Sequence, residues 1–193
     1  MRKVLYLTMF MIVLGACGVK KHSDVSYENH GIPLPPPESE VQEGDFVYRL
    51  YTEKDVYDTL GGTAIFAELT YIGEQDEIEI AHASSPFYFP LEERTRKIHV
   101  DYAMNSPLIV TTLKKDVPHQ HRYEFAGGYS DQDDPDYVEF VKTIIEEKGF
   151  PEGEYIIHGA ARFTVAGQDD DMQDLPETEL ATDIGFRVVD PIK

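Results

Sequence analysis

The fold of this chain is decided most clearly by the stretch Tyr155-Ile-Ile-His-Gly-Ala-Ala-Arg-Phe163. Its odd-numbered positions are aromatic, aliphatic or small, and they alternate with a second set that includes His158 and Arg162. A period of two residues is the side-chain period of a β-strand. The stretch therefore predicts a strand with one buried face and one face near solvent.

The same alternation recurs along the chain from Asp45 onward. It covers residues 46–51, 65–71, 77–80, 97–102 and 180–188. Turn-forming residues separate these runs at Gly61-Gly62, Gly73, Ser84-Ser85-Pro86, Asn105-Ser106-Pro107 and Gly127-Gly128. Several short strands with this spacing indicate a mainly β sandwich or barrel. We expect one domain over residues 45–193.

One segment has helical spacing instead. Its apolar residues fall on one face of a helix over about residues 135–148, and they are Tyr137, Phe140, Val141, Ile144 and Ile145. Asp134 suits the N-cap position, Pro135 the first turn and Gly149 the C-terminal stop. We expect this helix to cross from one sheet to the other and to pack on the edge or end of the sandwich.

Two stretches carry a resemblance to a known fold. Pro151-Glu152-Gly153-Glu154-Tyr155 resembles the turn into a late strand of immunoglobulin-like sandwiches, where a tyrosine hydroxyl bonds back to the main chain. Residues 57–71 are similar to early strands of extracytoplasmic immunoglobulin-like modules, such as small lipoproteins of spore-forming Gram-positive bacteria and the intracellular proteinase inhibitors of bacilli. The resemblance implies an immunoglobulin-like antiparallel β-sandwich with one crossover helix. No inhibitory loop can be matched, so protease inhibition is not carried over.

The first residues have the features of a secretory signal. Met1-Arg2-Lys3 is basic, and Val4 to Leu14 is almost wholly apolar but shorter than the roughly 20 residues that span a bilayer. Leu14-Gly15-Ala16-Cys17 resembles the lipobox of bacterial lipoproteins, and Cys17 is the only cysteine. The resemblance implies a signal peptide over residues 1–16, cleavage before Cys17 and lipid attachment to its thiol. The alternative is an ordinary secretory signal in which Cys17 is incidental.

Residues 17–44 have the composition of a tether. Pro33-Leu34-Pro35-Pro36-Pro37 favours the extended polyproline II conformation, which makes a semi-rigid spacer. Removal of residues 1–16 would leave 15 basic against 36 acidic residues, a net charge of −21. This charge argues against nucleic acid and anionic lipid surfaces as partners. Acyl chains on Cys17 are then the expected link to the membrane.

Two kinds of side chain are candidates for metal binding. His119 and His121 would point to one face of a strand about 7 Å apart, and His82, His99 or Asp101 could add a third ligand. An ordinary exposed strand start is the simpler interpretation. Asp131, Asp133, Asp134 and Asp136, and separately Asp169-Asp170-Asp171 with Asp174, suggest weak calcium loops without the spacing of an EF-hand. A helix N-terminus and a solvated hairpin loop explain them more simply.

Pro86-Phe87-Tyr88-Phe89-Pro90 predicts a short edge strand, because proline cannot donate to a ladder. Phe87 and Phe89 would share one face, either in the core or as an aromatic strip for a partner. The chain has no nucleophile elbow and no phosphate-binding glycine loop. We expect no enzyme activity and no cofactor.

The sequence favours a lipid-anchored binding or interaction module on the extracytoplasmic face of the cell membrane. Its partner would be a protein or an envelope polymer. The alternative is a metal-handling lipoprotein that uses the face of His119 and His121, and an envelope hydrolase with dispersed residues is a third hypothesis.

Overall fold

The computed structural model describes residues 33–59, 62–166 and 176–191. The predicted signal peptide over residues 1–16, Cys17 and the acidic run with Asp169 and Asp174 lie outside the described residues. The chain divides into two units, and the described residues belong, apart from Pro33, to the unit that begins at Leu34.

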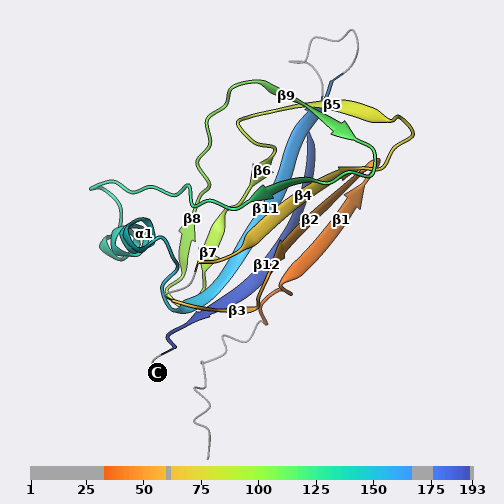
Figure 1. Ribbon diagram of the computed structural model, residues 1–193. Helices are drawn as coiled ribbons and strands as arrows, with labels where there is room; N and C mark the ends of the chain where they lie inside the picture. Colours follow the sequence, from red (N-terminus) through yellow and green to blue (C-terminus); the bar gives the residue numbers. More distant parts are fainter. Residues whose placement is uncertain (1–32, 60–61, 167–175, 192–193) are drawn as a thin grey trace, which may run out of the picture. The chain divides into compact units, whose positions relative to one another are not determined.

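The elements of this unit are strands, apart from a single helix among the described residues (Figure 1). In chain order they are β1 (Glu38–Glu43), β2 (Phe46–Thr52), β3 (Val56–Asp58), β4 (Ile65–Tyr71), β5 (Glu77–His82), β6 (Phe87–Tyr88), β7 (Leu91–Glu93), β8 (Ile98–Val100), β9 (Ile109–Lys114), β10 (His119–Arg122), α1 (Pro135–Glu147), β11 (Gly153–Val165) and β12 (Thr178–Val189).

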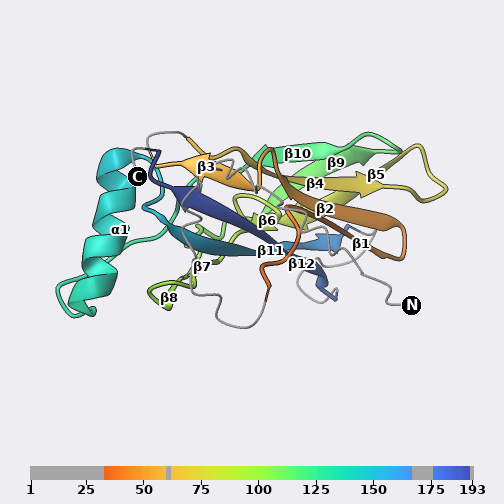
Figure 2. The same cartoon turned by 90° about the horizontal axis from the view of Figure 1, so that it is seen from below.

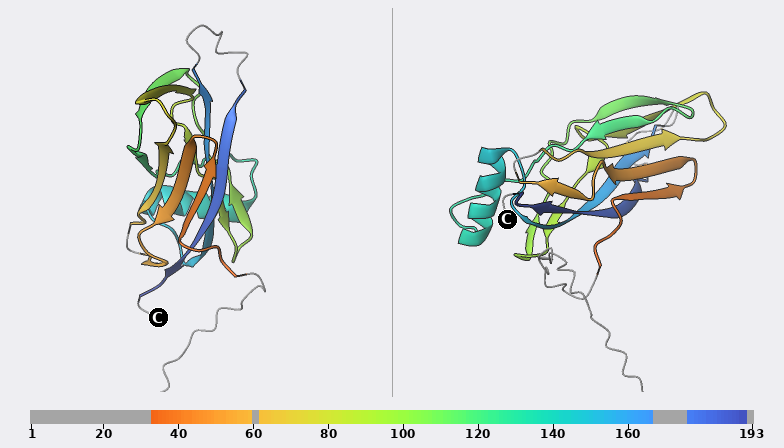
Figure 3. Two further views of the ribbon diagram at one scale, coloured as in Figure 1. Left: turned by 90° about the vertical axis from the view of Figure 1, so that its right-hand side faces the viewer. Right: turned by 60° about the horizontal axis from the view of Figure 1, so that its bottom comes forward.

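The strands form two sheets that pack as a sandwich (Figure 1, Figure 3). The smaller sheet has the order β1-β2-β4-β10. The larger runs β3-β12-β11-β5-β9, with β6 and β7 also beside β11, and β8 beside β7. The named strands pair antiparallel except β3 and β12, which are parallel. The prediction of a mainly β sandwich with a single helix is confirmed.

Alternation along β2, β4 and β11 builds the core between the sheets. In β2, for example, every second side chain from Phe46 to Leu50 is buried. These side chains meet the inner face of β11, where the rings of Phe46 and Phe163 lie 4.8 Å apart edge to face. The stretch from Tyr155 to Phe163 is thus the long strand that its alternation predicts.

Helix α1 lies at one end of the sandwich, as Figure 2 shows. The Asp134 carboxylate accepts a hydrogen bond from the backbone N–H of Asp136 at 2.9 Å and caps the helix. Lys148 closes it in the left-handed conformation, with φ +54°, directly before Gly149. Because α1 connects β10 of one sheet to β11 of the other, the predicted crossover is confirmed.

The tyrosine at the start of β11 behaves as the resemblance implied. The Tyr155 hydroxyl donates to the carbonyl oxygen of Pro151 at 2.6 Å, although its ring is fully buried. Position 153, beside this turn, requires glycine, because a Cβ there would collide with the buried carboxylate of Glu93. The short Pro-Glu-Gly turn and the hydroxyl contact together fix the direction in which β11 begins.

The unit that begins at Leu34 starts before the predicted boundary at residues 44 and 45. Glu38–Glu43 forms β1 and pairs with β2 across a turn at Gly44, whose φ is +54°. Further upstream, the Pro36 carbonyl accepts from the N–H of Gly185 at 3.2 Å. Residues 34–43 are therefore part of the sandwich rather than of a tether. An edge strand with charged side chains shows no alternation of apolar residues, so hydrophobic periodicity does not predict it.

Candidate functional site

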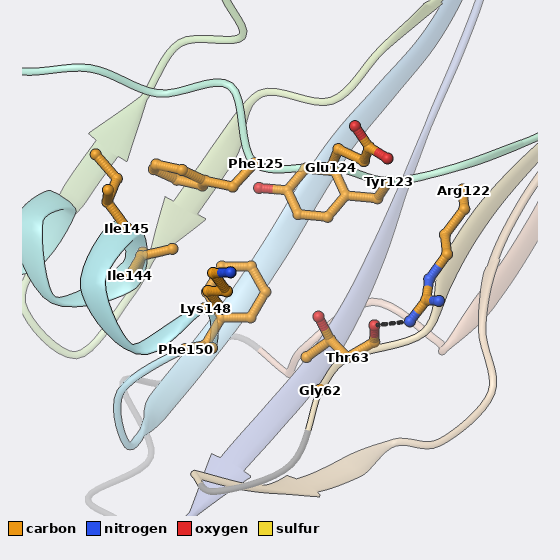
Figure 4. A pocket seen from close by; sticks show the side chains of 11 residues that line it. Gly62, Thr63, Arg122, Tyr123, Glu124, Phe125, Ile144, Ile145, Lys148 and Phe150 are labelled. Atoms are coloured by element: carbon orange, nitrogen blue, oxygen red, sulfur yellow. Dashed lines mark hydrogen bonds between the residues drawn. The ribbon is translucent and has the colours of Figure 1, made fainter.

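A solvent-open cleft of about 670 Å³ lies between the end of α1 and the chain that follows β10 (Figure 4). Three chain segments supply its walls. The lining residues are Gly62, Thr63, Arg122, Tyr123, Glu124, Phe125, Ile144, Ile145, Lys148, Gly149 and Phe150. A volume of this size is in the range of clefts that take small ligands or the side chains of a partner.

The apolar wall of the cleft is positioned by both neighbouring elements. The N–H of Tyr123 donates to the carbonyl of Ile65 at 2.9 Å, which continues the pairing of β10 with β4 by one residue. Phe150, just after the helix stop, is buried and stacks on Tyr123 with 6.1 Å between ring centroids. On α1, Ile144 is buried but the next residue, Ile145, is 47% exposed. The cleft thus keeps apolar surface in contact with water.

Charged groups stand at the rim. Arg122 donates to the backbone carbonyl of Thr63 at 3.2 Å, which holds its guanidinium beside the opening (Figure 4). Lys148 provides a second cation and Glu124 a carboxylate. Burial raises the pKa of Tyr123, with a smaller contribution from Tyr102, so the hydroxyl stays neutral. The lining residues include no histidine, cysteine or serine. An apolar floor with a polar rim is suited to binding.

The two histidines of the predicted metal pair point into the sandwich. Ring centroids of His119 and His121 lie 5.8 and 6.0 Å from that of Phe87, in stacked orientations. Burial lowers the pKa of His119, and the nearby His82 and His121 lower it further. Both rings therefore serve as half-buried packing groups.

The expected third ligands lie in different surroundings. His82 is bonded to the Thr111 hydroxyl at 2.8 Å and to the Ala83 carbonyl at 2.8 Å. His99 lies beside Asp101 at 3.4 Å, and its ring centroid is 6.2 Å from that of His158. In the part of the chain that the structure describes, no three His, Cys, Asp or Glu side chains form a group that could hold a metal.

In the first acidic cluster, the carboxylates of Asp133 and Asp134 accept hydrogen bonds from neighbouring residues of the chain. The Asp133 carboxylate accepts from the N–H of Ser130 at 2.6 Å and from its hydroxyl at 3.0 Å, while Asp134 caps α1. These contacts agree with the helix-terminus interpretation of the cluster. The second cluster, Asp169-Asp170-Asp171 with Asp174, lies outside the described residues.

The aromatic run at residues 86–90 divides between core and surface. Phe87 and Phe89 are buried in the core, at 0% and 1% exposure. Tyr88 is only partly buried, and the guanidinium of Arg162 lies 4.9 Å from its ring centroid. The flanking prolines act as acceptors, since their carbonyls take N–H groups of β11. The phenylalanines are therefore core residues, and the strip reduces to one half-exposed ring.

A cluster on the outer face of the larger sheet is not apparent from the sequence. His158 on β11 lies 2.9 Å from the Asp183 carboxylate on β12 and 3.3 Å from that of Glu92 on β7. Each residue stands alone in the sequence, so the register of three strands is needed to bring them together. His158 connects the two carboxylates, Asp183 through Nδ1 and Glu92 through Nε2.

The comparisons with protein-family models, with curated proteins and with solved structures found no match to this chain. Within residues 33–59, 62–166 and 176–191, no helix has the length and apolar character needed to cross a membrane.

Proposed function

We propose that this chain is a lipid-anchored binding module on the extracytoplasmic face of the cell membrane. The proposal of an anchor rests on the lipobox-like Leu14-Gly15-Ala16-Cys17, which follows a basic and then apolar start. Acyl chains on Cys17 would hold a strongly acidic domain that anionic lipid itself repels. The partner would be a protein or an envelope polymer with apolar groups.

One observation carries the binding function: the cleft of Figure 4 keeps aromatic and aliphatic surface open to water. Ile145 remains 47% exposed beside the buried Ile144 and Phe150. The rim of the cleft carries two cations, Arg122 and Lys148, together with the carboxylate of Glu124. This arrangement favours a partner that brings an apolar group into the cleft.

The binding proposal is tested by photo-crosslinking in the cells that make the protein. A crosslinking residue at position 145 is expected to yield a defined adduct. The same residue at position 56 serves as control, because Val56 is 40% exposed on strand β3 and is not among the residues that line the cleft. Adducts that are the same from both positions, or none from position 145, would refute a specific cleft partner.

The anchor is tested independently by mass spectrometry of the mature N-terminus. The expected product begins at Cys17 and carries a thioether-linked diacylglycerol. The Cys17→Ser variant is expected to leave the membrane fraction. An unmodified thiol in native material would overturn the anchor and leave the cleft result unaffected.

A further inference from the structure

The free edge of β9 differs in composition from the other edges of the two sheets. β1 carries Glu38, Glu40 and Glu43, β10 reads His-Gln-His-Arg, and β3 and β8 have three residues each. Short length and charge are the usual protections of an edge strand against pairing with another chain. β9 has six residues, and its only charged side chain is the terminal Lys114.

The apolar residues at the start of β9 are in contact with water. Leu108, Ile109 and Val110 are consecutive and are 66%, 37% and 44% exposed. Val117, in the connection to β10, is 53% exposed. The edge strands of natural proteins usually avoid such a run of exposed apolar residues.

The hydrogen-bonding pattern leaves backbone groups of β9 turned outward. The N–H of Lys115 donates to the Asp76 carbonyl at 2.9 Å, so this pair bonds directly across the ladder. Bonded pairs alternate in an antiparallel ladder, and the register therefore directs Ile109, Thr111 and Leu113 toward β5. The N–H and C=O groups of Val110 and Thr112 face the other way. Among the described strands, β9 pairs with β5 alone (Figure 1).

On the opposite side of the sandwich, hydrogen bonds join the edges of the two sheets, so that side differs from the side of β9. There the hydroxyls of Ser39 on β1 and Thr182 on β12 lie 2.6 Å apart, and Pro36 bonds to Gly185. On the side of β9, contact with the smaller sheet is made at the strand end, where Asp116 donates to the Tyr71 carbonyl at 2.9 Å. The part of β9 before that point is the open edge.

We propose that this edge, residues 108–112, binds an extended segment of another polypeptide as an added β-strand. Main-chain bonds to Val110 and Thr112 would hold the segment, and its apolar side chains would cover Leu108 and Val110. The segment is uncharged or cationic, because the chain has a net charge of −19 and repels a second copy or an acidic peptide. This inference is independent of the anchor and of the cleft.

The test measures the binding of labelled peptides to the full chain, purified in detergent, by fluorescence anisotropy. The first probe alternates valine and threonine over six residues with a lysine at each end. A second probe has glutamate at the ends, and a third is N-methylated at alternate residues and cannot pair. Saturable binding of the first, at least tenfold weaker binding of the second and none of the third are expected.

Two matched variants locate the site. Val110→Lys is expected to weaken binding of the lysine-ended peptide at least tenfold, since lysine is a natural guard of strand edges. Val56→Lys, at 40% exposure on the edge strand β3, is expected to change it less than twofold. Circular dichroism of both variants checks that the fold is kept.

Several results would overturn the proposal. The first is no saturable binding of the lysine-ended peptide up to about 1 mM. The second is an equal loss of affinity for that peptide in the two variants, and the third is binding of the N-methylated probe as tight as that of the first probe. Dimerisation of the chain that Val110→Lys abolishes would identify a second copy as the occupant instead. Binding that requires removal of residues 17–32 would identify the chain's own N-terminal segment.

Discussion

A hydroxyl without a partner lies at the centre of the sandwich. Tyr48 is fully buried, and its hydroxyl oxygen has no hydrogen-bond partner among the described residues. Burial raises the pKa of Tyr48, so the group stays protonated and neutral. A buried polar group that gives up water without gaining a partner lowers the stability of the fold.

Tyr48→Phe is therefore expected to raise the free energy of unfolding by about 1 kcal/mol. Urea unfolding monitored by circular dichroism measures the change. Tyr57→Phe is the matched control, because the Tyr57 hydroxyl bonds to the Thr52 hydroxyl at 2.6 Å and to the Ala64 carbonyl at 3.2 Å. That variant is expected to lose about 1–2 kcal/mol. A loss of stability in both variants would contradict the assignment of Tyr48 as unsatisfied.

The same hydroxyl explains why residue 159 is glycine. A Cβ at Gly159 would lie 2.5 Å from the Tyr48 oxygen and 2.6 Å from a methyl carbon of Leu50. Gly159→Ala is accordingly expected to cost about 1–3 kcal/mol through overpacking. Because Tyr48→Phe removes the nearest atom, the double variant should recover part of this cost. Strict additivity in the double-mutant cycle would count against direct contact.

At the scale of elements, β10 brings a histidine pair against the core. The pKa of His119 is lowered chiefly by burial and also by His82 and His121. In the unfolded chain the imidazole titrates near 6.5. As the pH falls through 6.5, the unfolded state takes up a proton before the folded state does, and the fold loses stability.

His119→Asn is expected to reduce this acid sensitivity. The measurement is the urea midpoint of both proteins between pH 7.5 and pH 5. The difference between the two proteins reports His119 together with its electrostatic coupling to His82 and His121. If the two midpoints fall in parallel, the histidine contributes no proton linkage.

The sequence predicts elements well where burial follows a simple period. β2, β4, β11, β12 and α1 have strong alternation or helical spacing, and all lie where expected. β1 escaped this reasoning because its glutamates show no buried face, and it is held by backbone pairing with β2. Periodicity also places His119 and His121 on one face, but only the packing of Phe87 on the opposite sheet shows that this face is inward.

The cleft and the open edge could not be predicted from local sequence. Thr63, Tyr123 and Ile145 come from three segments, and the exposure of Ile145 depends on where α1 docks. The outward groups of β9 likewise follow from the register with β5, not from its residue types. Both features arise from long-range pairing, which a period within one segment does not encode.

At the scale of the molecule, the residues that begin the sandwich, from Leu34 onward, decide whether it is complete. β1 pairs with β2 along six residues, and Pro36 bonds to Gly185 of β12 on the side opposite β9. A Cβ at position 185 would lie 2.8 Å from the Pro35 carbonyl oxygen, so the chain at residues 34–36 sits directly on the β12 backbone. Residues 34–43 therefore connect the two sheets.

A chain that begins at Asp45 is expected to be less stable than one that begins at Leu34 by at least about 2 kcal/mol. Several backbone hydrogen bonds of about 0.5–1.5 kcal/mol each are lost with β1. Without β1, the backbone N–H and C=O groups of β2 would be unpaired at a free edge, where another chain could pair with them. Urea unfolding and sedimentation of the two chains measure both effects. Equal stability would mean that β1 adds no strength to the fold, and that the alternation beginning at Phe46 marks its true limit.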